Sequence, residues 1–342
     1  MIKKYILLSL LLTQILLGAV AQQNTAPEKK ILTPVNLYPP IKIDTRSPTR
    51  HGPVNGSLLI IGGHEGSTRS IWDKFTELAG GKDKAVIVVV TTAVGDSAAI
   101  DIKDINNIKK QTGIQNVTLL HTKDLKEANS AKFIEPLKSA TGVFFVGGRQ
   151  WRIADSYLNT LTQKAFFDVL NRGGVIAGTS AGASIMGSFL WRGDTHGPQI
   201  TIGDHTQGLG FLKSSAIDQH LFMRNREFDL IDFIKKSPKL IGIGIDEATA
   251  VVIKKDTLEV VGDSFIAIYD NTNIMGLGPK HITNRGEDFN SSDGPFFMLH
   301  EGQKYDLNAR KVIVPPRRPR AAGPARAGTN EPEPNDGLDL VR

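Results

Sequence analysis

The sequence contains no cysteine, and this absence excludes several chemistries before any motif is considered. A chain of 342 residues without a thiol has no disulfide framework, no thiolate metal site and no cysteine nucleophile. It also lacks an H-E-x-x-H motif, a Walker phosphate loop and a G-x-G-x-x-G loop in a suitable context. We therefore expect neither a metal ion nor a nucleotide cofactor.

The sequence has little charge excess in its central part. Lys and Arg outnumber Asp and Glu by 41 to 35, but part of this excess lies at the N-terminus and in an arginine-rich C-terminal segment. No basic stripe interleaved with aromatic residues occurs between them, so we expect no nucleic-acid partner. With 40% hydrophobic and 22% charged residues, the composition is that of a soluble globular protein with a sizeable core.

Long apolar runs are rare, and the one at the N-terminus is too short for a typical membrane span. Lys3 and Lys4 precede an apolar run over residues 5–17, and Ala19-Val20-Ala21 matches the small-residue pattern of a cleavage site. We predict a signal peptide over residues 1–21, cleaved before Gln22. The mature protein is then expected to be secreted or periplasmic, without a stable membrane anchor.

Three further segments are predicted after the signal peptide. Residues 22–54 are rich in Pro, Lys and Thr without periodicity, which indicates an extended leader. Residues 55–314 form one folded domain in this interpretation. Residues 315–342 begin with Pro-Pro-Arg-Arg-Pro-Arg and cannot bury a core, so we predict a disordered tail.

The domain alternates short apolar runs with amphipathic segments, which predicts an α/β fold with a mostly parallel sheet and helices on both faces. The predicted strands are 58–61, 85–90, 117–120, 143–146 and 175–177, and the predicted helices are 67–78, 98–110 and 153–170. After Leu240 four short β-like runs follow, at 240–245, 250–253, 258–261 and 265–269. They predict an antiparallel C-terminal extension at one edge of the sheet.

The strongest local motif is Gly178-Thr179-Ser180-Ala181-Gly182, which matches G-x-S-x-G. It follows an apolar strand and precedes small residues that can open a helix, as a nucleophile elbow requires. The turn is so tight that the flanking positions must be very small, and the strained serine then projects above the sheet. This context predicts Ser180 as a nucleophile.

A serine nucleophile needs a base, and His220 is the favoured candidate because it follows an apolar run and should lie at the C-terminal end of a strand. His205 and His64 are the rivals. The orienting acid is left open between Asp246 and Glu247, which follow the run 240–245, with Asp218 as a third option. Adjacent strand positions point to opposite faces, so only one of the first two can face the base.

Two polar clusters are candidates for contacts with a substrate. Gly147-Gly148 closes a strand, and its backbone N–H groups suit an oxyanion hole together with the N–H of Ala181. Gln150 follows and could hold a substrate amide or carboxylate. Gln219, Arg224 and Arg226 surround His220 in the sequence, and guanidinium groups bind carboxylates in a bidentate manner.

Four stretches together resemble the cyanophycinases in order and approximate spacing over roughly residues 55–275. They are Gly147-Gly148-Arg149-Gln150, residues 178–183, Asp218-Gln219-His220 with the two arginines, and residues 244–250. Cyanophycinases belong with dipeptidase E to a family of serine peptidases specific for aspartyl bonds. Their fold is similar to flavodoxin and to class I glutamine amidotransferases, with serine in place of cysteine.

The resemblance implies Ser180 as nucleophile, His220 as base and Glu247 as acid. It further implies substrate contacts for the residues Gln150, Asp218, Gln219, Arg224 and Arg226. A peptide with aspartyl residues, β-linked in our interpretation, is then the expected substrate. A homodimer without a metal ion or other cofactor is the expected form of the enzyme.

Two positions depart from the family pattern, and both change charge near the expected site. Arg149 stands where the family typically has Asp, and Asp229 stands where it typically has Arg. Cyanophycin, a polymer of β-aspartyl-arginine units, therefore competes with short isoaspartyl or α-aspartyl peptides as the substrate. A non-catalytic binding protein on the same scaffold is the alternative of another class, and the intact Ser180, His220 and Glu247 argue against it.

Overall fold

The computed structural model describes residues 50–66, 68–95, 103–270 and 296–313, all of which fall in the compact unit Ile43–Arg342. The predicted signal peptide, most of the leader and the tail from residue 315 lie outside the described residues, and so does the start of the predicted helix 98–110. Within the described ranges, no helix is both long and apolar enough to cross a membrane.

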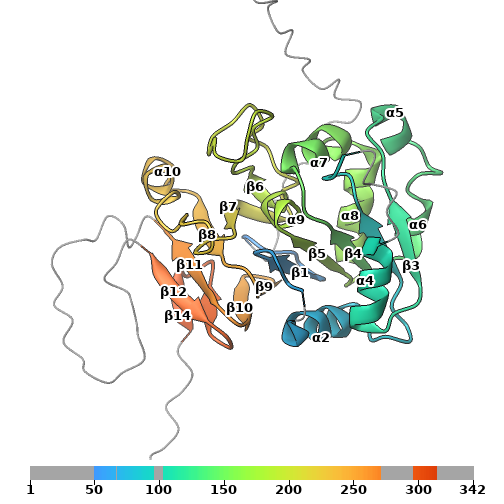
Figure 1. Cartoon of the computed structure of the whole chain (residues 1–342), viewed down its shortest axis with the longest axis horizontal. Helices are drawn as coiled ribbons and strands as arrows, with labels where there is room; N and C mark the ends of the chain where they lie inside the picture. Colours follow the sequence, from blue (N-terminus) through green and yellow to red (C-terminus); the bar gives the residue numbers. More distant parts are fainter. Residues whose placement is uncertain (1–49, 67, 96–102, 271–295, 314–342) are drawn as a thin grey trace, which may run out of the picture. The chain divides into compact units, whose positions relative to one another are not determined.

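The larger of two sheets has nine strands, and β1 (Ser57–Ile61) runs through its middle (Figure 1). On one side of β1 all pairings are parallel, and the strands that follow outward are β5 (Val175–Thr179), β4 (Gly142–Phe145), β2 (Ile87–Val90) and β3 (Val117–Leu120). On the other side all pairings are antiparallel, and the strands are β9 (Thr249–Lys254), β10 (Thr257–Gly262), β13 (Lys304–Asp306) and β14 (Lys311–Ile313). The parallel strands and the antiparallel extension at one edge are as predicted, although the extension is as large as the parallel part.

A second sheet of five strands corrects the prediction for two of the C-terminal segments. Its order is β12 (Phe297–His300), β11 (Phe265–Tyr269), β8 (Ile241–Ile245), β7 (Leu212–Gln219) and β6 (Gly187–Phe189). The runs 240–245 and 265–269 therefore do not extend the first sheet, and β8 pairs with β7 in parallel. Gly242 and Gly244 have no side chains, so the side chains of Tyr269 and Leu221 pack directly on the backbone of β8. This packing buries β8 in the middle of the second sheet.

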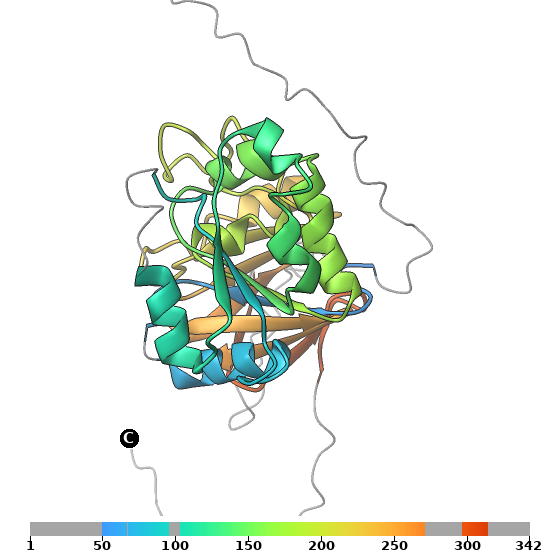
Figure 2. The ribbon, with the colours of Figure 1, turned by 90° about the vertical axis from the view of Figure 1, so that its right-hand side faces the viewer.

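Helices cover both faces of the nine-stranded sheet (Figure 2). The ribbon shows α2 and α4 together on one face, with α7, α8 and α9 on the other. The bounds are α2 (Arg69–Leu78), α4 (Lys103–Thr112), α5 (Leu125–Ala128), α6 (Glu135–Ser139), α7 (Gln150–Tyr157), α8 (Leu161–Asn171), α9 (Ala181–Ser184) and α10 (Ile231–Lys236). Strands such as β1 and β2 are wholly buried because both of their faces are covered.

The segment 153–170 contains two helices rather than the single one predicted, with the break between α7 and α8. Asn159 has a positive φ of 58°, which ends the first helix. Thr160 then caps the second, because its Oγ1 accepts a hydrogen bond from the N–H of Gln163 at 3.2 Å. Gln163 in turn accepts from the N–H of Asn159 at 2.7 Å. The apolar periodicity of the sequence continues across this break, so periodicity alone predicts one helix. The capping box T-x-x-Q at residues 160–163 is the sequence signal that marks the start of the second helix.

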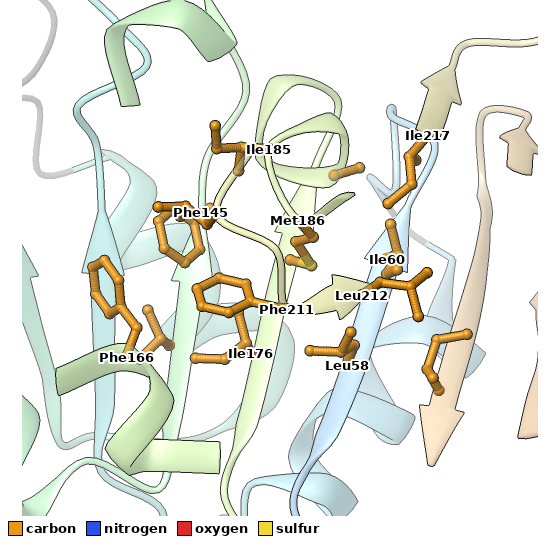
Figure 3. Packing of buried hydrophobic residues seen from close by; sticks show 14 of the residues in the cluster. Leu58, Ile60, Phe145, Phe166, Ile176, Ile185, Met186, Phe211, Leu212 and Ile217 are labelled. Atoms are coloured by element: carbon orange, nitrogen blue, oxygen red, sulfur yellow. The ribbon is translucent and has the colours of Figure 1, made fainter. Parts of the chain in front are cut away.

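The main hydrophobic core lies between the sheet and α8 and α9 (Figure 3). The rings of Phe145 and Phe166 pack edge to face with centroids 5.0 Å apart, and Phe211 completes the group at 6.2 and 6.3 Å from them. Figure 3 shows Met186 next to the Phe211 ring and Ile60 farther away, beyond Met186 on β1. A Cβ on Gly178 would lie 2.8 Å from Cε of Met186, so this core reaches the C-terminal end of β5, and Ser180 follows that end directly.

Three residues ahead of β1 are attached to the turn between β9 and β10. The Asp256 carboxylate accepts hydrogen bonds from the backbone N–H groups of Arg50, His51 and Gly52 at 2.8–3.3 Å. His51 also makes two hydrogen bonds to the backbone of Lys213: its ring nitrogen Nδ1 bonds the carbonyl of Lys213, and its own carbonyl accepts from the N–H of Lys213. Residues 50–52, placed in the leader by the sequence, therefore contact the folded domain.

Removing this carboxylate tests whether residues 50–52 contribute to stability. Asp256→Ala leaves three backbone donors without their acceptor, and we expect it to lower the free energy of unfolding by about 1–3 kcal/mol. Thermal or denaturant unfolding measures the change. The exposed Asp83→Ala is the matched control and is expected to change stability by less than about 0.5 kcal/mol. Equal stability of the two variants would show that the attachment contributes nothing.

Candidate active site

Ser180 stands on a strained turn between β5 and α9. Its backbone angles are φ 54° and ψ −111°, a region that non-glycine residues rarely occupy. A Cβ on Gly178 would lie 2.4 Å from the carbonyl oxygen of Gly182, and a Cβ on Gly182 would lie 2.3 Å from that of Phe145. Both glycines of the motif are therefore required by close backbone contacts, as in a nucleophile elbow.

A continuous chain of hydrogen bonds connects Ser180, His220 and Glu247. Nε2 of His220 lies 2.9 Å from Oγ of Ser180, and Nδ1 of His220 lies 2.6 Å from Oε1 of Glu247. His220 directly follows β7, and Glu247 lies in the turn between β8 and β9. The structure brings together the three residues that the sequence singled out, although they come from both sheets.

The choice between Asp246 and Glu247 is resolved by their contacts. Asp246 accepts hydrogen bonds from the backbone N–H groups of Phe222 and Met223 and from the hydroxyl of Ser264, at 2.8–3.1 Å. It therefore fixes the loop after His220 to the turn after β8. Glu247, the neighbouring residue, is left to contact the imidazole.

The backbone at the end of β1 forms hydrogen bonds with each of the three segments that carry Ser180, His220 and Glu247. The carbonyl of Ile61 accepts from the N–H of Ser180 at 3.1 Å, and that of Gly62 accepts from the N–H of His220 at 3.0 Å. The carbonyl of Gly63 accepts from the N–H of Ala248, the residue after Glu247, at 2.9 Å. A Cβ on Gly63 would lie 2.2 Å from Cε1 of His220, so only glycine allows the imidazole this position.

The environment of His220 favours the neutral imidazole. Burial lowers the pKa of His220 below its ordinary value of 6.5, and the positive charges of Arg224 and Arg226 lower it further. The hydrogen bond to Glu247 and its charge act in the opposite direction. A neutral ring at neutral pH is the form that can accept a proton from the hydroxyl of Ser180.

The strand end at Gly147 lies beside the hydroxyl of Ser180. A Cβ on Gly147 would lie 3.4 Å from Cβ and 3.9 Å from Oγ of Ser180, so this strand end passes directly beside the nucleophile candidate. No described residue accepts a hydrogen bond from the backbone N–H of Gly147, Gly148 or Ala181. These predicted oxyanion donors are therefore free to bind a negatively charged oxygen.

A pocket of about 510 Å³ lies among the loops that follow β6 and β7, and arginine side chains dominate its lining. It is lined by Arg192, Pro198, Gln199, Arg224, Arg226 and Asp229. Burial lowers the pKa of Arg226 to about 10, with neighbouring Arg192 and Arg224 adding to the effect. This clustering of positive charge favours an anion in the pocket.

Three predicted substrate contacts turn out to lie behind the pocket surface. Asp218 is fully buried, and its carboxylate accepts hydrogen bonds from Trp191, from Arg192 and from its neighbour's backbone at 2.9–3.0 Å. Gln219 accepts from Arg226 at 3.0 Å, and Nε2 of Gln150 donates to the carbonyls of Trp191 and Arg192 at 2.9 Å. In this structure they hold the arginines and the loop after β6 in place.

The two positions that depart from the family pattern both contact this loop. Arg149 donates from its guanidinium to the carbonyl of Asp194 at 2.6 Å. Asp229 lines the pocket and accepts a hydrogen bond from Arg192. Arg192 is the functional candidate that the sequence interpretation missed, because a single arginine in an irregular loop matches no motif. Arg192 and Asp218 are 26 residues apart in the sequence, and no local pattern predicts that they form a hydrogen bond.

The two rival histidines do not share the geometry of His220. The ring nitrogens of His205 lie 2.8 Å from carboxylate oxygens of Asp155 and Asp204, and these partners, Asp155 first, raise the pKa of His205 to about 9. A protonated ring is no base at neutral pH. His64 is exposed and carries a positive φ of 46° just after Gly63.

One group of side chains in the described ranges has metal-ligand spacing, namely Asp194, His196 and Asp204. Its carboxylates already accept hydrogen bonds from His196, from Thr195 and from the backbone of Asp204. None of its members belongs to the chain of hydrogen bonds at Ser180.

Several known proteins are similar to this chain. The model of peptidase family S51 matches residues 58–261. A cyanophycinase from Synechococcus elongatus is 30% identical over 294 residues, which cover 82% of this chain and 90% of that protein. A cyanophycinase from Trichormus variabilis is 31% identical over 264 residues, covering 75% and 87%.

The fold is also found in a solved structure, the crystal structure of a peptidase from an acI-B1 Actinobacterium. It superposes with a TM-score of 0.54 at 22% identity and covers 74% of this chain and 97% of that one. The α/β fold, the family match over most of the folded domain and the relatives at about 30% identity agree with one another. This chain is a serine-type peptidase that belongs to peptidase family S51.

Proposed function

We propose that this peptidase hydrolyses aspartyl peptides, preferentially β-linked ones, by acyl transfer through Ser180. The observation that carries the proposal is the unbroken chain of hydrogen bonds from Ser180 through His220 to Glu247 at the end of a nucleophile elbow. Neutral imidazole, strained serine and free backbone donors meet at one point, and acyl transfer requires all three.

The reaction follows from these positions. Nε2 of His220 takes the proton of the Ser180 hydroxyl as Oγ attacks the carbonyl carbon of the scissile amide. The new oxyanion binds the N–H groups of Ala181 and of Gly147 or Gly148, and Glu247 stabilises the imidazolium. His220 then gives the proton to the leaving amine as the C–N bond breaks. Water, deprotonated by His220, hydrolyses the acyl-enzyme and restores the serine.

The arginine pocket supports an acidic acyl group. An aspartyl residue linked through its side chain carries a free α-carboxylate beside the scissile bond, and a guanidinium can bind both of its oxygens. Arg226 donates through one nitrogen to Gln219, so this hydrogen bond fixes the guanidinium at the pocket wall. The relatives named cyanophycinase favour a substrate of this class.

Cyanophycin and short aspartyl peptides are the two candidate substrates, and the charge of Asp229 in the pocket lining bears on the choice. Asp229 adds a negative charge to the lining of a pocket whose other charged residues are arginines, and it pairs with Arg192. Release of dipeptides from cyanophycin, compared with hydrolysis of β-aspartyl dipeptides, separates the two substrates.

The N-terminal sequence supports export of the enzyme, because a basic start, an apolar run and a small-residue site occur in order. The family resemblance also favours a homodimer that works without a metal ion. We expect the mature protein, recovered from the cell envelope or medium of the expressing bacterium, to begin at Gln22. N-terminal sequencing measures this, and an intact Met1 on the exported protein would contradict cleavage.

The catalytic assignment predicts non-additive losses. Ser180→Ala and His220→Ala should each reduce kcat by roughly three orders of magnitude or more, because the residues act in the same step. The double variant should be little slower than either single one. Steady-state kinetics together with thermal unfolding measure activity and folding separately. Multiplied losses in the double variant would show that the two residues do not share a step.

The pocket assignment predicts a loss of discrimination in Arg226→Ala. Without its guanidinium the acyl carboxylate lies unpaired, which costs on the order of 1–3 kcal/mol, or about five- to 150-fold in kcat/KM. The preference for β-Asp-Leu over α-Asp-Leu should fall accordingly, while a small fluorophosphonate still labels Ser180. Arg152→Ala, on α7, is the control with an arginine outside the pocket lining. Equal discrimination in all three proteins would place the carboxylate elsewhere.

A further inference from the structure

A carboxylate with no part in the reaction derived above stands beside the nucleophile. Glu65 is half-buried, and its Oε2 accepts a hydrogen bond of 2.6 Å from the hydroxyl of Thr179, the residue before Ser180. No described residue donates a hydrogen bond to the other oxygen, Oε1. One oxygen of the carboxylate is thus fixed, and the second is available to another group.

Hydrogen bonds hold the backbone at Glu65 and at the following Gly66. The carbonyl of Glu65 accepts from the N–H of Thr68 at 2.8 Å, and the indole of Trp72 donates to the carbonyl of Gly66 at 3.0 Å. Trp72 belongs to α2 and is itself buried. The carboxylate is therefore held in place before any ligand arrives, which lowers the entropic cost of binding.

The chain that leads to Glu65 passes along the imidazole of His220. Gly63 contacts this ring so closely that a Cβ would lie 2.2 Å from Cε1 and 2.9 Å from Nε2. Nε2 is the atom that returns the proton to the leaving amine. The leaving residue must therefore lie near Nε2 when the bond breaks, and Glu65 is only two residues from Gly63.

The charges on the two sides of the nucleophile have opposite sign. The pocket with Arg224 and Arg226 is formed by the loops after β6 and β7. Glu65 precedes α2, which covers the other face of the nine-stranded sheet from α9 (Figure 1). A substrate that places its acidic acyl group among the arginines would direct its leaving residue toward the Gly63–Glu65 segment.

We propose that Glu65 binds the positively charged side chain of the residue that follows the scissile bond, and so determines specificity on the leaving-group side. The ligand class is a guanidinium or an ammonium group, because either donates charge-assisted hydrogen bonds to a carboxylate oxygen. The proposal rests on the acyl-transfer function proposed above. It gives the leaving residue a recognition site separate from the arginine pocket.

The test compares leaving residues that differ in charge. The substrates are β-Asp-Arg-amide, β-Asp-Lys-amide and β-Asp-Leu-amide, whose capped C-termini avoid a carboxylate that Glu65 would repel. Glu65→Gln keeps an oxygen that can accept from Thr179 and removes the charge. We expect its ratio of kcat/KM for the arginine over the leucine substrate to fall about tenfold relative to the wild type, the equivalent of one charge-assisted hydrogen bond.

Thr179→Val is the matched control, because it deletes the hydrogen bond and keeps the carboxylate. If Glu65 recognises the cation, the arginine-to-leucine ratio of Thr179→Val should stay within about twofold of the wild-type ratio. If Glu65 merely supports the turn before Ser180, Thr179→Val should lower kcat/KM for all three substrates by a common factor, Glu65→Gln should change kcat/KM little, and the ratio should not change in either variant. That second result would overturn the proposal.

Two outcomes distinguish this proposal from the proposed function. Hydrolysis of all three amides by the wild type, with an unchanged ratio in Glu65→Gln, would remove the role of Glu65 and leave the acyl-transfer function intact. Hydrolysis of none of them, in a protein whose Ser180 still reacts with a fluorophosphonate, would overturn both the aspartyl specificity and the role of Glu65.

Discussion

The active-site geometry depends on the close backbone contacts at the C-terminal end of β1. Three successive carbonyl groups, of Ile61, Gly62 and Gly63, each accept a hydrogen bond from a different segment of the chain. These segments carry Ser180, His220 and Glu247. The N–H of Gly62 adds a fourth bond, to the carbonyl of Thr249. A Cβ on Gly62 would lie 2.1 Å from the carbonyl oxygen of Asp246, so any larger residue would separate the segments.

The electrostatics of the site follow from the same convergence. Bringing His220 into the interior removes it from water and favours its uncharged form. The arginines that follow it in sequence act in the same direction, and Glu247 alone opposes them among these groups. The site thus combines a positively charged pocket with a base that remains neutral beside it. A carboxylate entering the pocket would offset part of the arginine charge and raise the pKa of His220 again.

The sequence was sufficient for features that depend on local patterns. Strands such as 58–61 and 87–90 are continuous apolar runs, and the elbow around Ser180 carries its glycines at fixed positions. Features that depend on distant contacts do not follow from local patterns, and only the family resemblance favours Glu247 at the sequence level. The choice of Glu247 over Asp246 depends on which carboxylate the loop after His220 binds. Membership of β8 in a second sheet depends on the packing of Tyr269 and Leu221 over its glycines.

The attachment of residues 50–52 to Asp256 has a practical consequence. Asp256 follows β9, which is antiparallel to β1, so this attachment lies beside the N-terminal end of β1. The five residues of β1 separate that end from the end that bears the hydrogen-bonded triad, a rise of roughly 15 Å. The described chain therefore enters the fold at the N-terminal end of the central strand β1, and the nucleophile lies at the opposite end of this strand. An immobilisation tether or fusion partner joined ahead of Arg50 would leave the approach of peptides to Ser180 open.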